Sequence, residues 1–86
     1  MKMLIKETEN EGLESLLGKK VTIFTSGYFY TGTLIGVNDT CVLLEDAKII
    51  YETGKFSDSD WKDAQSLCID EFYVQKSAIE SFGKTK

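Results

Sequence analysis

The feature that most constrains the fold is the stretch from residue 21 to residue 51, which is rich in β-branched and aromatic residues. Such residues favour strands. The pairs Ser26-Gly27 and Asn38-Asp39 divide this stretch at hairpin spacing, because these residue types adopt tight turns. The pattern therefore predicts three consecutive antiparallel strands, over residues 21–25, 28–37 and 41–51.

Glycines interrupt the second of these strands at Gly32 and Gly36. A glycine inside a strand commonly marks a sharp bend or a close approach of two backbones. A long strand bent in this way turns the corner of a small barrel. A β-bulge is also predicted at Glu45-Asp46 in the third strand. Two more strands are expected after it, over residues 66–75 and 78–82.

The remaining segments flank or interrupt these strands. Residues 1–9 are interpreted as a loose arm, and a short helix is predicted between residues 10 and 18, with Asn10 as one of two candidate N-caps. Helical spacing places three apolar side chains on one face of that helix, namely Leu13, Leu16 and Leu17. Residues 52–66 are polar and are interpreted as a loop inserted between the third and fourth strands. One domain of mainly β class is predicted over residues 1–86, a short helix followed by a strongly bent, five-stranded antiparallel small barrel.

Composition excludes several classes of protein. Hydrophobic residues make up 42% and charged residues 28% of the 86 residues, as in an ordinary globular domain. The apolar runs are too short for a membrane-spanning helix. The absence of histidine excludes imidazole catalysis and histidine metal ligands. All ten basic residues are lysines, and 14 acidic residues outnumber them. This balance excludes a protein whose whole surface is positively charged for binding nucleic acid, but it does not exclude a local basic patch.

The cysteines and the acidic loop point away from an enzyme. Cys41 and Cys68 lie among apolar residues, and no secretory signal precedes them, so both are predicted to be reduced core residues of a cytoplasmic protein. Neither has an activating base beside it, and the chain lacks a glycine-rich phosphate loop. Asp58, Asp60 and Asp63 lack the glycine and the final glutamate of a calcium loop. We therefore expect no catalytic residues, no metal and no cofactor.

Two segments resemble the two motifs of the Sm-like family, which includes the LSm and Hfq-like proteins. In the first, four residues separate Gly27 from Gly32, and the segment continues through the Asn38-Asp39 turn into an aliphatic strand. In the second, residues 74–79 read Val-Gln-Lys-Ser-Ala-Ile and are similar to Val-Tyr-Lys-His-Ala-Ile of bacterial Hfq proteins. The resemblance extends over about residues 11–82, apart from the inserted loop at 52–66, and it implies an Sm-like fold.

The resemblance also implies a homo-oligomeric ring. Sm-like proteins pair the fourth strand of one subunit with the fifth strand of the next, so that identical copies complete each other's sheet edges in a closed ring of about five to seven subunits. The family binds single-stranded RNA, with DNA as an alternative ligand, in RNA processing or riboregulation. The same ring without RNA binding, as a protein-interaction or structural module, is the alternative that the acidic balance favours. Apolar residues suit both predicted edge strands, namely Leu67, Ile69, Phe72, Val74, Ile79 and Phe82.

The family's RNA site carries over by position to the turn and to the second motif. In the family, uridines stack on a residue of the loop between the second and third strands and are held by the Lys-His pair. The corresponding residues here are Asn38, Asp39, Thr40, Lys76 and Ser77. Lys76 matches, whereas Thr40 departs from the usual aromatic or bulky residue and Ser77 departs from histidine. Stacking a base on an aromatic ring contributes about 1–3 kcal/mol, and Thr40 does not supply it. The alternatives are a solvated turn for Lys76 and a simple turn pair for Asn38-Asp39.

Aromatic residues offer two further candidate surfaces. Tyr28 and Tyr30 share one face of the second strand, because alternate residues of a strand point the same way. They are predicted either to stack bases on the ring face opposite Lys76 or to cover the barrel. Phe56 and Trp61 lie in the polar inserted loop, where they either pin the loop down or bind a partner.

Overall fold

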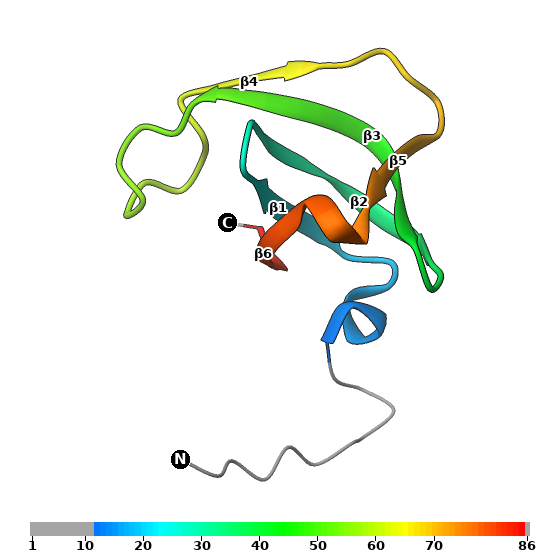
Figure 1. The fold of residues 1–86 in the computed structure, drawn as a ribbon. Helices are drawn as coiled ribbons and strands as arrows, with labels where there is room; N and C mark the ends of the chain where they lie inside the picture. Colours follow the sequence, from blue (N-terminus) through cyan, green and yellow to red (C-terminus); the bar gives the residue numbers. More distant parts are fainter. Residues whose placement is uncertain (1–11, 86) are drawn as a thin grey trace, which may run out of the picture.

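The computed structural model describes residues 12–85 and has the antiparallel, mainly β architecture that the sequence predicts (Figure 1). Within these residues, two short 3-10 helices and six strands follow one another. In chain order they are η1 (Gly12–Leu16), β1 (Lys20–Thr25), β2 (Phe29–Val37), β3 (Cys41–Glu52), β4 (Asp63–Ser66), β5 (Phe72–Gln75), η2 (Lys76–Ala78) and β6 (Ile79–Lys84). Neither of these helices is long and apolar enough to cross a membrane.

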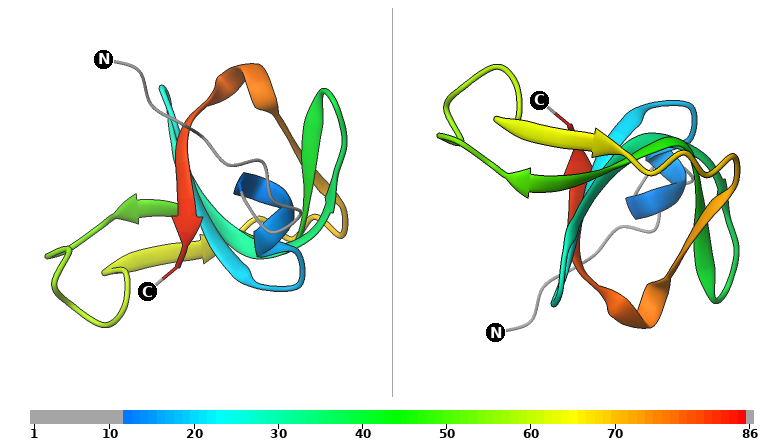
Figure 2. Two further views of the ribbon diagram at one scale, coloured as in Figure 1. Left: turned by 90° about the horizontal axis from the view of Figure 1, so that it is seen from below. Right: turned by 90° about the horizontal axis from the view of Figure 1, so that it is seen from above.

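The strands form one strongly bent sheet. Their order is β4-β3-β2-β1-β6, and β5 pairs with β3 off this path. Strand β3 is 12 residues long, so its first part pairs with β5 and its last part pairs with β4. Figure 2 shows the sheet curled around its core, with β6 at one end and β4 and β5 at the other. These end strands do not pair with each other in residues 12–85, so the barrel is open.

The predicted bulge is confirmed, and it explains the glycine opposite it. Thr31 pairs with Lys48, but Thr33 pairs with Glu45, so β3 carries one extra residue at this point. Asp46 adopts a φ of 53° there. A Cβ atom on Gly32 would lie 3.0 Å from the carbonyl oxygen of Glu45. Position 32 therefore requires glycine because two backbones meet there.

The core is small and lies between the curled strands. Its fully buried side chains alternate along the strands, with Val21 and Ile23 from β1, Leu34 from β2, and Val42 and Leu44 from β3. Such alternation places one face of each strand inward. Two leucines of the predicted apolar stripe, Leu13 and Leu16, pack against this core, whereas Leu17 is exposed.

The helix ahead of β1 is shorter than predicted. The helix expected between residues 10 and 18 is the five-residue 3-10 helix η1, and its candidate cap Asn10 and the arm at 1–9 lie outside the described residues. Glycines with positive φ stand at both ends of the turn, at Gly12 (71°) and Gly18 (83°). A positive φ lies outside the helical region, so a helix does not continue through either glycine. The segment between them therefore has room for little more than one helical turn.

Of the fourth strand expected at residues 66–75, only Ser66 and β5 are strand, and residues 67–71 lie between β4 and β5. Strand β4 falls at the end of the segment predicted as the inserted loop, residues 52–66, so that prediction is wrong over residues 63–66. The cause lies in β3. Its bulge bends the strand between the part that pairs with β4 and the part that pairs with β5, so a straight partner cannot follow it. Leu67 turns inward and packs against the core, and Cys68 adopts a φ of 56°. Cys68 is therefore exposed rather than a core residue, while Cys41 is half-buried and the two thiols are not joined.

Candidate nucleic-acid interface

The turn between β2 and β3 is closed by a 3.0 Å hydrogen bond from the Asn38 backbone N–H to the Cys41 carbonyl oxygen, and by the Asn38 side chain. The Asn38 Oδ1 atom accepts hydrogen bonds from the backbone N–H groups of Thr40 and Cys41, both at 2.8 Å. It also lies 3.2 Å from the Thr40 hydroxyl and 3.4 Å from the Cys41 thiol, which are further donors. Asparagine commonly folds a turn in this way. All four contacts of the Asn38 carboxamide oxygen lie within the turn, as the simple-turn interpretation of this residue predicts. The next two residues, Asp39 and Thr40, are exposed.

A second contact joins this turn to the second motif. The backbone N–H of Lys76, at the start of η2, donates a 2.8 Å hydrogen bond to the carbonyl oxygen of Thr40. The two segments are 36 positions apart in sequence and meet because β5 pairs with β3, with Gln75 opposite Cys41. The structure therefore brings together the turn and the lysine that the sequence analysis selected separately.

These residues surround a hollow of about 540 Å³ on the surface. The side chains and backbone that line it belong to Asp39, Thr40, Cys41, Tyr73, Gln75, Lys76 and Ser77. Of the five residues predicted from the two motifs, only Asn38 does not line it. No carboxylate in residues 12–85 lies within 4.0 Å of the Lys76 ammonium group, so its charge is not neutralised by a direct ion pair there. The hollow offers one cation, one carboxylate and several hydroxyl and amide groups.

Three lining residues were not selected from the sequence, namely Cys41, Tyr73 and Gln75. For Tyr73 and Gln75, the sequence did not show which side chains of β5 point away from the core. Val74 is buried in the core, so Tyr73 and Gln75 on either side of it point outward. Their outward direction follows from the register of β5 on β3, which the sequence alone does not show.

The two tyrosines of the second candidate surface lie elsewhere. Tyr28 and Tyr30 are at the hairpin end of β2, whereas the turn at Asn38 follows its other end. Tyr30 is half-buried and its ring lies 5.0 Å from that of Phe72 between centroids, so it packs against the core. Tyr28 is 56% exposed, and its ring lies 6.3 Å from that of Tyr30. Of the pair, only Tyr28 offers a largely accessible ring.

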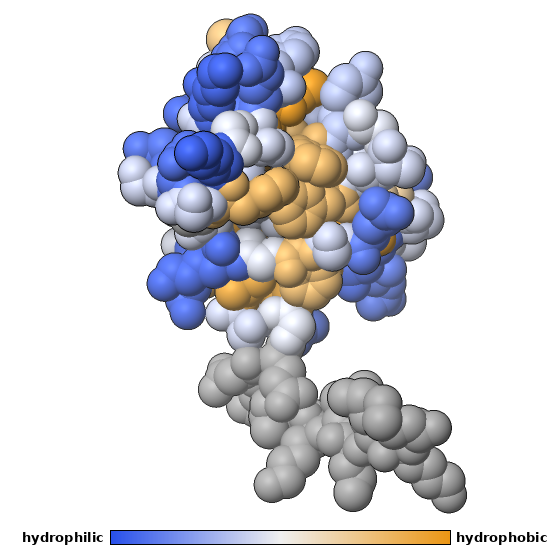
Figure 3. Space-filling view, turned by 90° about the vertical axis from the view of Figure 1, so that its left-hand side faces the viewer, coloured by the Kyte–Doolittle hydropathy of each residue, from blue (hydrophilic) through white to orange (hydrophobic). Residues whose placement is uncertain are grey.

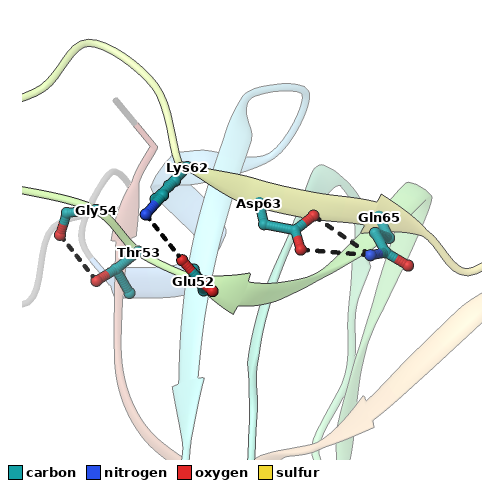
Figure 4. Close-up of polar contacts among 6 residues, drawn as sticks. All are labelled: Glu52, Thr53, Gly54, Lys62, Asp63 and Gln65. Atoms are coloured by element: carbon teal, nitrogen blue, oxygen red, sulfur yellow. Dashed lines mark hydrogen bonds and ion pairs between the residues drawn. The ribbon is translucent and has the colours of Figure 1, made fainter.

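The inserted loop predicted at residues 52–66 is shorter in the structure, where residues 53–62 connect β3 to β4. Polar contacts close its base. The Lys62 ammonium lies 3.2 Å from a carboxylate oxygen of Glu52 (Figure 4). Figure 4 also shows Gln65 donating to the carboxylate of Asp63 on β4. The indole N–H of Trp61 donates to the Thr85 hydroxyl at 3.3 Å, which agrees with the interpretation that the loop aromatics pin the loop down.

Comparison with known proteins identifies the fold. Neither a protein-family model nor a curated protein sequence matches the chain. Among solved structures, it is similar to an Sm protein of Pyrococcus abyssii, whose structure is that of a complex with a uridine heptamer. The TM-score is 0.57, the sequences are 20% identical, and the match covers 83% of this chain and 89% of the Sm protein. The chain has an Sm-like fold. The resemblance predicted from the two motifs is confirmed at this level.

Proposed function

We propose that this chain is a subunit of a homo-oligomeric ring that binds single-stranded RNA at the hollow between the β2–β3 turn and η2. The observation that carries the proposal is the hydrogen bond from Lys76 to Thr40, which joins the two motif segments around one surface hollow. The similar Sm protein was solved with a uridine heptamer, which supports RNA as the ligand class. We propose Asp39, Thr40, Lys76 and Ser77 as contacts to RNA, and Asn38 as the residue that holds the turn in shape.

The open sheet supports the ring. An edge strand presents unpaired N–H and C=O groups, and a head-to-tail contact between copies satisfies them when the rotation closes. Strand β6 ends one side of the sheet and β5 lies at the other, so we propose that β5 of one subunit pairs with β6 of the next. Apolar side chains also gather on one face of the molecule, ringed by polar ones (Figure 3).

The apolar residues available for this contact are fewer than the sequence predicted. Of the six assigned to the two edges, four pack in or against the protomer's own core, namely Leu67, Phe72, Val74 and Ile79. Ile69 and Phe82 are exposed. The proposed contact between subunits therefore relies on backbone pairing and on these two side chains.

Charge supports a local rather than a general affinity for RNA. The chain carries a net charge of −4, which repels phosphates at a distance. A ring would repeat Lys76 around its axis together with Asp39, so the positive charge at each hollow is confined to the Lys76 ammonium group. The proposed binding is therefore electrostatic at the hollow and weakens as salt rises.

A second candidate function is a protein-interaction ring of the same fold. The exposed carboxylate of Asp39 in the hollow favours it, because a carboxylate repels phosphate groups. In both cases we propose a binding protein rather than an enzyme. We propose a cytoplasmic location because Cys41 and Cys68 are both free thiols.

Titration of labelled oligo-U and oligo-A by fluorescence anisotropy tests the proposal. We expect binding that weakens with salt, and a Lys76→Ala variant with lower affinity and a shallower dependence on salt concentration. Lys19→Ala is the matched control, because Lys19 is exposed and does not line the hollow. If the wild-type protein binds neither oligonucleotide at low salt, RNA binding is wrong and the protein-interaction ring is favoured.

A further inference from the structure

The hollow contains an aromatic ring that comes from a strand rather than from the turn. Tyr73 lies in the middle of β5, where 55% of the residue is exposed. Its neighbour Val74 is buried in the core, which directs Tyr73 to the outer face of the sheet. Tyr73 pairs with no other aromatic ring in residues 12–85, in contrast to Phe72, which packs against Tyr30.

The position of Tyr73 relative to the turn is set by the sheet. Tyr73 lies opposite Leu43 on β3, and Gln75, two residues further, lies opposite Cys41. Both β5 residues face the same way and line the hollow with Lys76. The hydrogen bond from the Lys76 backbone to Thr40 fixes the end of β5 against the turn. Tyr73 is therefore carried by a paired strand and lines the same hollow as Lys76.

Single-stranded nucleic acid is commonly bound by a cation for the backbone and an aromatic face for the base. We propose that Tyr73 stacks on a base in the hollow while Lys76 contacts the adjoining phosphate. This inference rests on the proposed function and assigns the stacking role that Thr40 does not fill. A base face is sequence-tolerant, so Tyr73 contributes affinity for any base rather than a choice of base.

The test compares oligo-U with an abasic oligonucleotide of the same length, which keeps the phosphates and lacks the bases. We expect Tyr73→Leu to weaken oligo-U binding by about 5- to 100-fold and to leave abasic binding unchanged, while Tyr73→Phe retains the wild-type affinity for both. Lys76→Ala should weaken both ligands. Tyr51→Leu is the matched control, because Tyr51 is as exposed as Tyr73 but does not line the hollow.

The outcomes distinguish the proposed RNA binding from the stacking role of Tyr73. If wild-type protein binds no oligonucleotide, the proposed function fails and the stacking role fails with it. If wild-type protein binds oligo-U and Tyr73→Leu binds it equally well, only the stacking role is wrong. If Tyr73→Leu changes the number of subunits in native mass spectrometry, Tyr73 is an interface residue and the inference is overturned.

A second measurement does not depend on removing the ring. In a Trp61→Phe background, a Tyr73→Trp variant carries its only tryptophan in the hollow, since the chain has one tryptophan. Stacking of a base on that tryptophan should quench its fluorescence as oligo-U saturates the site. An unchanged emission at saturation would contradict base stacking at this position.

Discussion

Replacement of Asn38 by alanine removes the side chain that organises the turn beside the hollow. Two backbone N–H groups, from Thr40 and Cys41, lose an acceptor at 2.8 Å. A net contribution of about 0.5–1.5 kcal/mol per hydrogen bond gives an upper range of about 1–3 kcal/mol for the pair. Because the turn is exposed, water replaces part of this, and we expect the free energy of unfolding to fall by about 1–2 kcal/mol.

The assay is urea unfolding of wild-type, Asn38→Ala and Asn38→Asp proteins at one protein concentration, because assembly makes apparent stability concentration-dependent. Aspartate retains a carboxylate oxygen at the same place, so Asn38→Asp should stay within about 0.5 kcal/mol of wild type. The alanine variant should also bind oligo-U more weakly, since its turn keeps only backbone hydrogen bonds and loses those to the Asn38 side chain. If Asn38→Ala is as stable as wild type and binds RNA equally well, the organising role assigned to Asn38 is wrong.

Three further predictions concern stability. Gly32→Ala should lower the free energy of unfolding by about 1–3 kcal/mol, because the added Cβ atom would lie 3.0 Å from a backbone oxygen. Gly27→Ala is the control and should not lower it, because nothing lies within 4 Å of a Cβ atom there. Equal melting temperatures for the two variants would refute the close contact at position 32. Leu34→Ala should cost about 2–5 kcal/mol in urea unfolding because Leu34 is fully buried, and a smaller loss would place it outside the core. Lys62→Ala should change stability by less than about 1 kcal/mol, because its ion pair with Glu52 is exposed, and a larger loss would mean that the pair anchors the inserted loop.

The hairpins were predictable because their signals are local. Ser26-Gly27 and Asn38-Asp39 adopt the expected turns, and the bulge at Glu45-Asp46 was anticipated from two adjacent polar residues in an apolar strand. Its consequence was not anticipated. Whether the bulge bends β3 enough to split its partner strand depends on how the sheet closes around the core, which local sequence does not specify.

The site was predictable in position but not in full composition. The motif resemblance placed Asp39, Thr40 and Lys76, and these residues line one hollow. Tyr73 was missed because it lies in a segment where apolar and polar residues do not alternate cleanly, so its outward direction follows only from the register of β5 on β3. The 3-10 character of η1 was likewise missed, because helical spacing of leucines does not distinguish one turn from two.

Native mass spectrometry with and without short oligo-U and oligo-A reports the number of subunits and the bound nucleic acid in one spectrum, so it tests both the ring and its ligand. We expect a single closed homo-oligomer that gains the mass of an oligonucleotide. A stable monomer whose mass is unchanged by either oligonucleotide would contradict both the completion of the open sheet by identical copies and the assignment of the hollow to RNA.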